Sequence, residues 1–453
     1  ALRKQVAAYL AWRRFLVVLG FCALAACAGR PPEAPLMEAP AAAPQRAWSV
    51  SAFAELRAVA AEATYRHGLS PEADAIEALD RLGRAAVRDT EAAQAFDRAA
   101  DELFGRLALT FAMGAADPAA VDPEWAIPRA AAPDVAGLRA TFAYGAGPAG
   151  VLRALLPSSP EYVALVDELL RVRNEPESAP DGNGLSRETR IDRLRVNLER
   201  WRWLPRDLPA RRVDVLVPLF ELRMRDAAAA MRHAVIVGAR RSPTPSFAAY
   251  IEAITLNPAS IANNELLPRF RRDPAAAARE GFDVLDSAGR AVDPAHVDWR
   301  VRPFPYTLRQ RAGPGNALGR LRFDLPNPHA VYLHDTPSRG LFARADRALS
   351  HGCIRVSEPL SLAADALFDP AWDEAALEAA IEAGATRSLP LGAPLPVYVL
   401  YLTAAPDESG VVKYAEDIYR RDAEVLRALD REVVSPLVAQ AMTDQTECSA
   451  MRR

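Results

Sequence analysis

Ser350-His351-Gly352-Cys353-Ile354-Arg355 is the stretch around which we expect the fold to be built, together with Ala330-Val331-Tyr332-Leu333-His334, which ends nineteen residues before the cysteine. A cysteine attacks as a thiolate, so a catalytic cysteine needs a nearby base and backbone N–H groups aimed at the developing oxyanion. Gly352 has no side chain, so a carbonyl group can approach the main chain beside Cys353. The pattern predicts a thiol active site with Cys353 as nucleophile and the backbone at Gly352 in the oxyanion hole.

The segment before His334 is rich in β-branched and aromatic residues, which predicts a strand that ends with the imidazole at its tip. The turn residues of Asp335-Thr336-Pro337-Ser338-Arg339-Gly340 predict a loop after it. A single cysteine in a glycine-containing turn is more often buried and inert. The catalytic interpretation of Cys353 therefore depends on His334 and on the rest of the chain.

The composition is that of a globular protein of two or three domains, because the chain has 453 residues, of which 50% are apolar and 25% charged. A net charge of −3 gives no bias toward polyanions, so we expect no nucleic-acid partner. Four cysteines are too few and too scattered for a disulfide framework. No cysteine and histidine spacing indicates a metal site, so neither a metal nor a cofactor is expected.

Residues 1–27 have the pattern of an export signal. Basic residues precede an apolar run from Phe15 to Ala26, which is too short to span a bilayer but suits a secretory h-region. Leu24-Ala25-Ala26-Cys27 resembles the lipobox of bacterial lipoproteins, which implies a lipidated Cys27 and a membrane contact through the lipid. Ala28 stands where an aspartate would favour inner-membrane retention, so we expect the periplasmic face of the outer membrane of a Gram-negative bacterium. A simple cleaved signal and an uncleaved anchor are the alternatives.

The rest of the N-terminal half predicts a tether followed by helices. Residues 28–46 are rich in proline and alanine and cannot pack a core. Residues 47–173 show helical spacing of apolar side chains, with helix starts expected at Ser70-Pro71-Glu72 and Ser159-Pro160-Glu161. No group of reactive side chains occurs there, so we expect a scaffold domain that could dock envelope proteins.

The C-terminal half predicts mixed helices and strands. Residues 174–190 form a linker by their turn residues, and residues 191–205 form an amphipathic helix that ends at a proline. The fold class is therefore α+β and multidomain. We expect strands at 213–219, 234–237, 321–325 and 396–402. We expect helices at 358–367, at 372–383 and from 422 onward, and a hairpin around 407–410.

His334-Asp335-Thr336-Pro337 followed by Ser350-His351-Gly352-Cys353 resembles the signature of the bacterial L,D-transpeptidases. The resemblance covers about residues 185–430 and includes the helix at 191–205. It implies a β-rich, mixed-sheet catalytic domain over residues 191–428. Residues 263–314 would be a helical insertion that caps the catalytic groove, although a surface subdomain is an alternative. Residues 429–453 would be a C-terminal helix and tail.

The resemblance also implies a reaction on peptidoglycan stem peptides. Cys353 would attack the carbonyl of the third residue of a tetrapeptide, release D-alanine and form a thioester. A stem amine would then give a 3–3 cross-link, an amine of another protein would anchor that protein, and water would trim the stem. His334 would act as base and acid, oriented by the main-chain carbonyl of Asp335, so the rate should fall below ~pH 6. His351 would support the site by shaping the turn.

Three further residues are expected at the substrate. The guanidinium of Arg355 could hold a carboxylate, with a structural salt bridge as the alternative. Tyr332 is assigned to substrate contact, and so is Ser350, which could instead support the cysteine loop through its hydroxyl.

The chain also departs from the family pattern. The short interval 174–190 leaves no room for the family's peptidoglycan-binding module, and the segment Leu256-Asn257-Pro258-Ala259-Ser260-Ile261 lacks several residues, including a tryptophan. Because that segment lies near the active-site wall in the family, substrate shape or activity could differ. The alternatives are a catalytically weakened wall-binding or scaffolding protein and an L,D-carboxypeptidase-like trimming enzyme.

Overall fold

The computed structural model describes residues 48–176, 180, 182, 184–226, 230–262 and 266–431. These residues belong to one compact unit of the chain. The predicted export signal, the lipidation site Cys27, the tether 28–46 and most of the C-terminal tail lie outside the described residues. No helix within the described ranges is long and apolar enough to cross a membrane.

The N-terminal part is helical, as the spacing of apolar residues predicted. Ser159 caps one helix as expected, because its hydroxyl accepts a hydrogen bond from the N–H of Tyr162 at 3.3 Å. The other expected start is wrong by a few residues: the hydroxyl of Ser70 donates to the carbonyl of Leu429 instead of capping. The helices are α1 (Val50–Tyr65), α2 (Ala73–Ala85), α3 (Thr90–Met113), α4 (Pro118–Val121), α5 (Val135–Ala140), α6 (Pro148–Arg153) and α7 (Pro160–Arg173).

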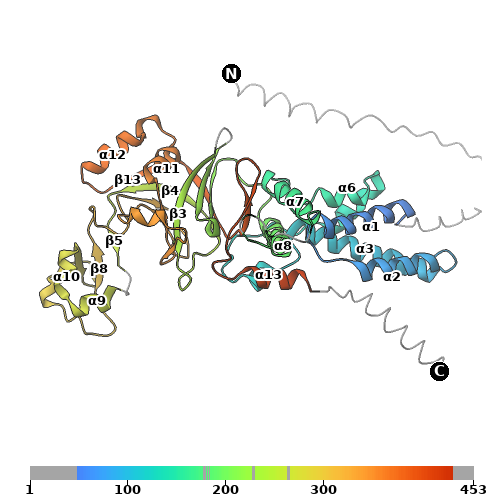
Figure 1. The fold of residues 1–453 in the computed structure, drawn as a ribbon, viewed down its shortest axis with the longest axis horizontal. Coiled ribbons are helices and arrows are strands. Elements are labelled where there is room, and N and C mark those ends of the chain that lie inside the picture. The colour runs from blue at the N-terminus through green and yellow to red at the C-terminus, as the bar shows by residue number, and fades with distance from the viewer. Residues whose placement is uncertain are drawn as a thin grey trace, which may run out of the picture. The chain divides into compact units, whose positions relative to one another are not determined.

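Helix α8 (Arg187–Trp203) joins the helices to the sheet, and it lies between the two in Figure 1. It begins four residues before the predicted start at Ile191, because Ser186 caps it by accepting from the N–H of Thr189 at 3.1 Å. The expected solvent-facing side is absent from its second half. Glu199, Arg200 and Arg202 are buried there, and ion pairs compensate their charges.

The main sheet has the order β11-β3-β12-β10-β9-β4-β13-β1-β2, and β2 also pairs with β3. All of these strands except β11 therefore form a closed ring around a core of Val, Ile, Leu and Phe side chains. The predicted strand 213–219 is shorter than expected, because Pro218 lacks an N–H and Val217–Leu219 forms a 3-10 turn. The strands are β1 (Arg212–Leu216), β2 (Glu221–Arg225), β3 (Ala230–Gly238), β4 (Phe247–Leu256), β9 (Leu321–Asp324), β10 (Leu333–His334), β11 (Ala348–Ser350), β12 (Ile354–Val356) and β13 (Arg387–Leu400).

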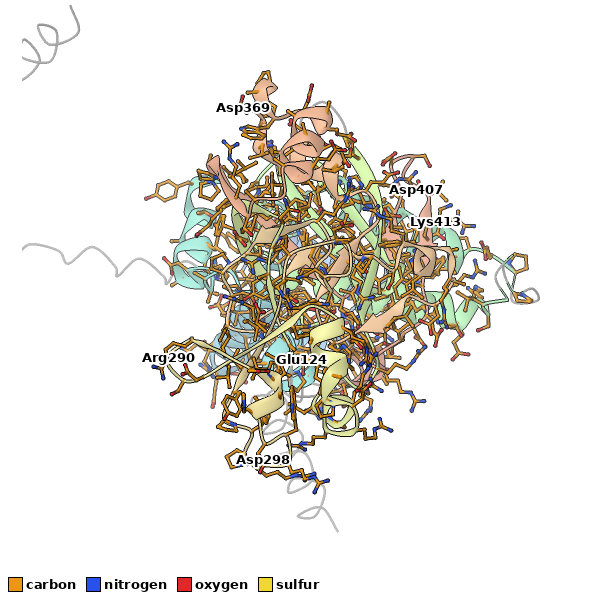
Figure 2. All side chains as sticks on the ribbon, turned by 90° about the vertical axis from the view of Figure 1, so that its left-hand side faces the viewer. Glu124, Arg290, Asp298, Asp369, Asp407 and Lys413 are labelled. Carbon is orange, nitrogen blue, oxygen red and sulfur yellow. The ribbon has the colours of Figure 1, made fainter. Side chains whose placement is uncertain are left out.

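The insertion after β4 has a small core of its own around Phe270, Phe282 and Trp299. It was predicted to be helical, but it holds both helices and an antiparallel sheet of order β5-β8-β6-β7. Figure 1 shows it in yellow, and Figure 2 shows Arg290 and Asp298 on its outer side. Its elements are β5 (Ser260–Ile261), α9 (Leu267–Arg272), α10 (Pro274–Arg279), β6 (Phe282–Leu285), β7 (Ala291–Val292) and β8 (Thr307–Gln310).

The C-terminal elements agree with the sequence prediction. The turn at Asp407-Glu408-Ser409-Gly410 connects an antiparallel hairpin, on which Figure 2 labels Asp407 and Lys413. The helix that follows packs against α8. These elements are α11 (Pro359–Leu367), α12 (Glu374–Glu382), β14 (Ala404–Pro406), β15 (Val412–Tyr414) and α13 (Asp422–Leu429).

Candidate active site

The predicted base lies on β10, and the predicted nucleophile immediately precedes β12, the adjacent parallel strand. In the pairing of β10 with β12, His334 lies opposite Arg355, and the N–H of Ile354 donates to the carbonyl of Tyr332 at 2.8 Å. Residues directly opposite each other share one face of a sheet. His334 and Arg355 therefore share a face, and Cys353 stands in the loop immediately before β12.

The imidazole of His334 is buried, and its Nδ1 lies 2.5 Å from the carbonyl oxygen of Asp335. The carbonyl can only accept, so Nδ1 carries the proton and Nε2 is the basic nitrogen of the neutral ring. Burial, and to a smaller extent the charge of Arg355, lower the pKa of His334 to about 4, although hydrogen bonds to the main chain of Asp335 and Leu318 act in the opposite direction. The imidazole is therefore neutral at pH 7, which is the state a general base requires.

The carboxylate of Asp335 is also buried and fixes the segment that follows His334. It accepts hydrogen bonds from the N–H of Arg320 at 2.8 Å and from the guanidinium of Arg339 at 2.8 Å. Gly319 has a φ of +65°, and a Cβ there would lie 2.5 Å from the Asp335 side chain. The sequence indicated only the carbonyl of Asp335, because nothing in the local pattern showed that residues 319–320 pack against its carboxylate.

The loop that carries Cys353 is held by hydrogen bonds to its backbone. The hydroxyl of Ser350 donates to the carbonyl of Cys353 at 2.5 Å and accepts from the N–H of Gly352 at 3.2 Å. The hydroxyl of Thr244 donates to the carbonyl of Gly352 at 2.8 Å. Ser350 is buried with its hydroxyl engaged in these bonds, which favours the role within the loop over the substrate contact. Thr244 was missed, because it lies about a hundred residues away in the sequence.

The thiol of Cys353 is partly exposed, and its Sγ lies 3.8 Å from the carbonyl oxygen of Ala330. Burial raises the pKa of Cys353, while a hydrogen bond from the main chain of Tyr332 and the charge of Arg355 act in the opposite direction. The thiol is therefore protonated at pH 7 and needs a base at the moment of attack. Cys353 is the only cysteine within the described ranges.

Arg355 places a positive charge beside both of these groups. Its Nε is buried without a hydrogen-bond partner in the part of the chain that the structure describes, and burial lowers the pKa of its guanidinium. No ion pair of Arg355 occurs among the described residues, which disfavours the structural salt bridge that the sequence left open. The guanidinium carbon of Arg322 lies 5.2 Å from the centre of the Tyr332 ring, so this aromatic face is already in contact with a cation.

His351 is exposed, in contrast to His334. The two histidines of the motifs thus differ in burial, and the tautomer of His334 is set by the carbonyl of Asp335. Across the described ranges, no group of three His, Cys, Asp or Glu side chains is arranged to hold a metal ion.

The shortened segment after β4 leads directly from the main sheet into the insertion. Asn257 has a φ of +47°, and its side-chain amide donates to the carbonyl of Ile381 at 2.8 Å. Three residues later Ser260 begins β5, which pairs with β8 of the insertion. Pairing of Leu256 with Leu321 continues up to this point, so the sheet that carries the site remains intact.

In comparisons with known proteins, one family model matches the helical part of the chain and another matches the β-rich part. Residues 210–369 match the YkuD family model, described as the L,D-transpeptidase catalytic domain, and residues 42–169 match the model of a scaffold domain. A curated protein of Haemophilus influenzae whose name includes the term L,D-transpeptidase is 34% identical over 249 residues, which are 53% of this chain and 50% of that protein. The chain thus spans about half the length of the curated relative it matches.

Each matched region has the architecture expected of it. The scaffold match covers the helices from α1 to α7, and the catalytic match begins just before β1 and includes the loop of Cys353. The resemblance that the sequence motifs indicated is therefore confirmed. This chain carries an L,D-transpeptidase catalytic domain of the YkuD family, preceded by a scaffold domain.

Proposed function

We propose that the protein is a peptidoglycan L,D-transpeptidase that makes 3–3 cross-links through a thioester on Cys353. The observation that supports this most is the pairing of β10 with β12, which brings a neutral imidazole with a fixed tautomer next to the loop of a protonated thiol. That is the resting state from which a base can take the thiol proton during attack.

In the proposed first step, Sγ of Cys353 bonds to the carbonyl carbon of the third stem residue while its proton passes to Nε2 of His334. The C–N bond to D-alanine then breaks, and His334 returns the proton to the leaving amine. In the second step, the amine of another stem attacks the thioester, its proton passes through His334, and the thiol is regenerated. Proton transfer in both directions needs only one histidine.

The oxyanion donor in this proposal is the N–H of Cys353. The sequence indicated the N–H groups around Gly352 and Cys353, and of these the N–H of Gly352 already donates to Ser350 at 3.2 Å. An N–H that is free to turn toward a new oxyanion stabilises it more than one that must first break a bond. Gly352 contributes to this proposal through its conformation, since its φ of +111° is one that other residues rarely adopt.

Arg355 is proposed to bind the terminal carboxylate of the stem. Its guanidinium lacks an ion-pair partner among the described residues, so a substrate carboxylate would compensate a partly buried charge. Tyr332 immediately precedes β10 and is proposed to line the binding surface. His351 lies in the loop of Cys353 and is proposed to support the turn.

The test uses protein lacking residues 1–27, incubated with disaccharide tetrapeptide. We expect D-alanine release and dimeric muropeptides by mass spectrometry, together with a covalent adduct on Cys353 after exposure to a carbapenem. Cys353→Ala should lose all three signals, and Cys448→Ala should keep them. A folded protein that gives neither product nor adduct would disprove the enzyme and favour a wall-binding or scaffolding role.

The acceptor is decided in the same assay. Cross-linking gives dimers, whereas trimming by water gives the tripeptide monomer alone, as an L,D-carboxypeptidase-like enzyme would. Anchoring of an envelope protein would appear as a stem peptide joined to a lysine of that protein. We propose the stem amine as acceptor, because the described active-site loop belongs to the transpeptidase domain.

The cellular location is proposed from the sequence of the first 28 residues. We propose export to the periplasm and lipidation at Cys27, with the lipid in the outer membrane. Metabolic labelling with palmitate should mark the wild-type protein, and Cys27→Ser should abolish the label. Labelling that persists in this variant would contradict the proposed anchor.

A further inference from the structure

We propose that Thr244 is a positioning residue that aims the oxyanion donor of Cys353, and that the scaffold domain holds Thr244 in place through residues 122–126. The inference rests on the proposed function for its catalytic consequence. Its structural part, the dependence of the Cys353 loop on Thr244, can be measured without any turnover.

The hydroxyl of Thr244 joins the end of β3 to the loop that carries Cys353. It accepts from the N–H of Gly238 at the end of β3, at 2.9 Å, and donates to the carbonyl of Gly352 at 2.8 Å. A hydroxyl has one proton, so donating it to Gly352 leaves only its lone pairs for Gly238. Thr244 is fully buried, and no water competes for either bond.

The bond to Gly352 determines where the N–H of Cys353 points. The carbonyl of Gly352 and the N–H of Cys353 belong to one planar trans peptide, in which these two groups point in opposite directions. Because Thr244 holds the carbonyl toward the protein interior, the N–H is directed away from the interior. That is the orientation an oxyanion donor needs, and it depends on a hydroxyl from the turn between β3 and β4.

Thr244 is itself held from two directions. The hydroxyl of Tyr419 accepts from the N–H of Thr244 at 3.3 Å and donates to the carbonyl of Gly238 at 2.5 Å. The guanidinium of Arg421 donates to the carbonyl of Thr244 at 3.4 Å. A Cβ on Gly238 would lie 2.2 Å from the carbonyl oxygen of Ser242, so the turn folds onto β3 only because residue 238 is glycine.

The scaffold domain contacts this turn two residues beyond Thr244. The N–H of Ala126 donates to the carbonyl of Ser246 at 2.6 Å, and the N–H of Ser246 donates to the carbonyl of Glu124 at 2.9 Å, so Trp125 and Ser246 form a parallel bridge. Figure 2 labels Glu124 on this segment. The ring of Trp125 packs edge-on against Trp203 of α8 at 5.0 Å, which keeps the segment against the helices.

A buried charge pair accompanies the bridge. Asp122 is almost fully buried, and its carboxylate lies 3.8 Å from the guanidinium of Arg421, the residue that also donates to Thr244. Residues 122–126 belong to the region that matches the scaffold domain. A path of contacts therefore runs from the scaffold domain through Arg421 and Ser246 to Thr244, and from there to the peptide that carries the N–H of Cys353.

The first experiment compares Thr244→Val with Thr244→Ser. Valine keeps the shape and removes both hydrogen bonds, whereas serine keeps the hydroxyl. We expect Thr244→Val to slow carbapenem acylation of Cys353 by about tenfold or more, because acylation forms an oxyanion. Alkylation by iodoacetamide forms none and should change less than about threefold. Thr244→Ser should restore most of the acylation rate.

If Thr244→Val slowed acylation and alkylation equally, the role of Thr244 would be purely structural and the proposal would be overturned. An acylation rate of Thr244→Val equal to that of the wild type would also overturn it. Amide hydrogen exchange of the peptide spanning 350–356 gives a readout that needs no activity. We expect faster exchange in Thr244→Val than in wild type and in Thr244→Ser. If Cys353 of the wild-type protein is not acylated and no D-alanine is released, the proposed function fails. Separately, unchanged amide exchange over 350–356 in Thr244→Val would refute the positioning role.

The second experiment tests the scaffold contact with Asp122→Asn, using Asp117→Asn as its control. Asp117 caps α4 in the same segment and is exposed, and asparagine caps nearly as well as aspartate. We expect Asp122→Asn to lower the acylation rate by about threefold to tenfold and to speed exchange over 350–356, because Arg421 loses its charged partner. Asp117→Asn should leave both unchanged. Equal behaviour of the two variants would refute the path through Asp122.

Discussion

Cys353 and His334 are both held in their uncharged forms near neutral pH. Burial raises the pKa of the thiol and lowers the pKa of the imidazole, and Arg355 disfavours a second positive charge on His334. A preformed thiolate–imidazolium pair is therefore disfavoured in the resting site. The proton must move during attack, which makes the Nδ1 contact with Asp335 important for placing the basic lone pair on Nε2.

The pH dependence of acylation follows from the shift on His334. A base with a pKa of about 4 is lost only when the pH falls through that value, so kcat/KM should stay level from pH 8 to about pH 5 and then drop with a midpoint near 4. The sequence predicted a fall below ~pH 6, and burial accounts for the difference. Stopped-flow acylation by a carbapenem checks this, provided that circular dichroism shows a folded protein. A midpoint at pH 6 or above would contradict the neutral resting pair.

Removing the charge of Asp335 should affect the reaction more than the fold. In Asp335→Asn, the ion pair with Arg339 is lost and the carbonyl that orients His334 can shift, so we expect kcat to fall by at least about tenfold while KM changes little. Asp369→Asn is the matched control, because Asp369 is an exposed capping residue, labelled in Figure 2, that lies in neither motif of the site. Steady-state D-alanine release measures both. An unchanged kcat in Asp335→Asn would show that the carboxylate does not hold the carbonyl.

Which site residues the sequence could indicate depended on how local their contacts are. Cys353, His334 and the Asp335 carbonyl lie in short recognisable motifs, and the structure brings those motifs to adjacent strands. The hydroxyl of Thr244 and the carboxylate of Asp335 make their contacts with segments far away or in other loops. A single sequence has no local pattern that records such contacts.

At the scale of elements, only the last two residues of the predicted strand before His334 belong to the ladder. Only Leu333–His334 pairs as β10, because Ala330 has a φ of +54° and interrupts the ladder. Its carbonyl consequently turns toward the sulfur of Cys353, at 3.8 Å. The strand predicted from residue composition is correct at Leu333–His334, but a left-handed alanine leaves no sign in the sequence.

Helix α8 shows the other limit of pattern reading. Its charged residues suggested a solvent-exposed side, but Glu199 is fully buried and accepts from Nε of Arg202 at 2.9 Å, from the N–H of Ala116 at 2.8 Å and from the indole of Trp203 at 3.0 Å. Hydrophobic periodicity cannot distinguish an exposed glutamate from one that is paired inside the protein. The helix therefore depends on its ion pairs as well as on its apolar side chains.

Truncating Glu199 should destabilise the protein strongly. In Glu199→Ala, Arg202 is left as an uncompensated buried charge and two further donors lose their acceptor, so we expect the free energy of unfolding to fall by about 3–5 kcal/mol. Glu188→Ala on the exposed first turn of the same helix should cost less than about 1 kcal/mol. Urea unfolding followed by tryptophan fluorescence compares the two. Equal costs would mean that the buried pair does not stabilise α8.

At the scale of the whole molecule, the helices and part of the sheet share one hydrophobic core. Leu216 of β1, Leu400 of β13 and Leu402 belong to the same cluster as Leu56 of α1 and Phe104 of α3. The sequence predicted the helical region and the β-rich region correctly as classes. Composition indicated a linker between them, but it could not show that side chains from both regions pack together, because core sharing is a property of the folded chain.

Stability should fall in mild acid, because three buried histidines are held neutral. Burial lowers the pKa of His67 and of His334 to about 4 and lowers that of His233 as well. The unfolded chain takes up these protons near pH 6.5 while the folded chain resists them, so stability is complete above pH 6.5 and is lost as the pH falls toward 4. For one histidine with a folded pKa of about 4, the loss between pH 7 and pH 5 is about 2 kcal/mol.

His67 allows this to be tested away from the site, since its Nδ1 pairs with the Tyr162 hydroxyl at 3.1 Å and lies near Arg202. His67→Gln removes the titrating group, so the drop in unfolding free energy from pH 7 to pH 5 should shrink by about 2 kcal/mol relative to wild type. His296→Gln, at an exposed position, should leave the drop unchanged. Urea unfolding at the two pH values measures this. If His67→Gln keeps the full wild-type drop, protonation of His67 does not contribute to the acid lability of the fold.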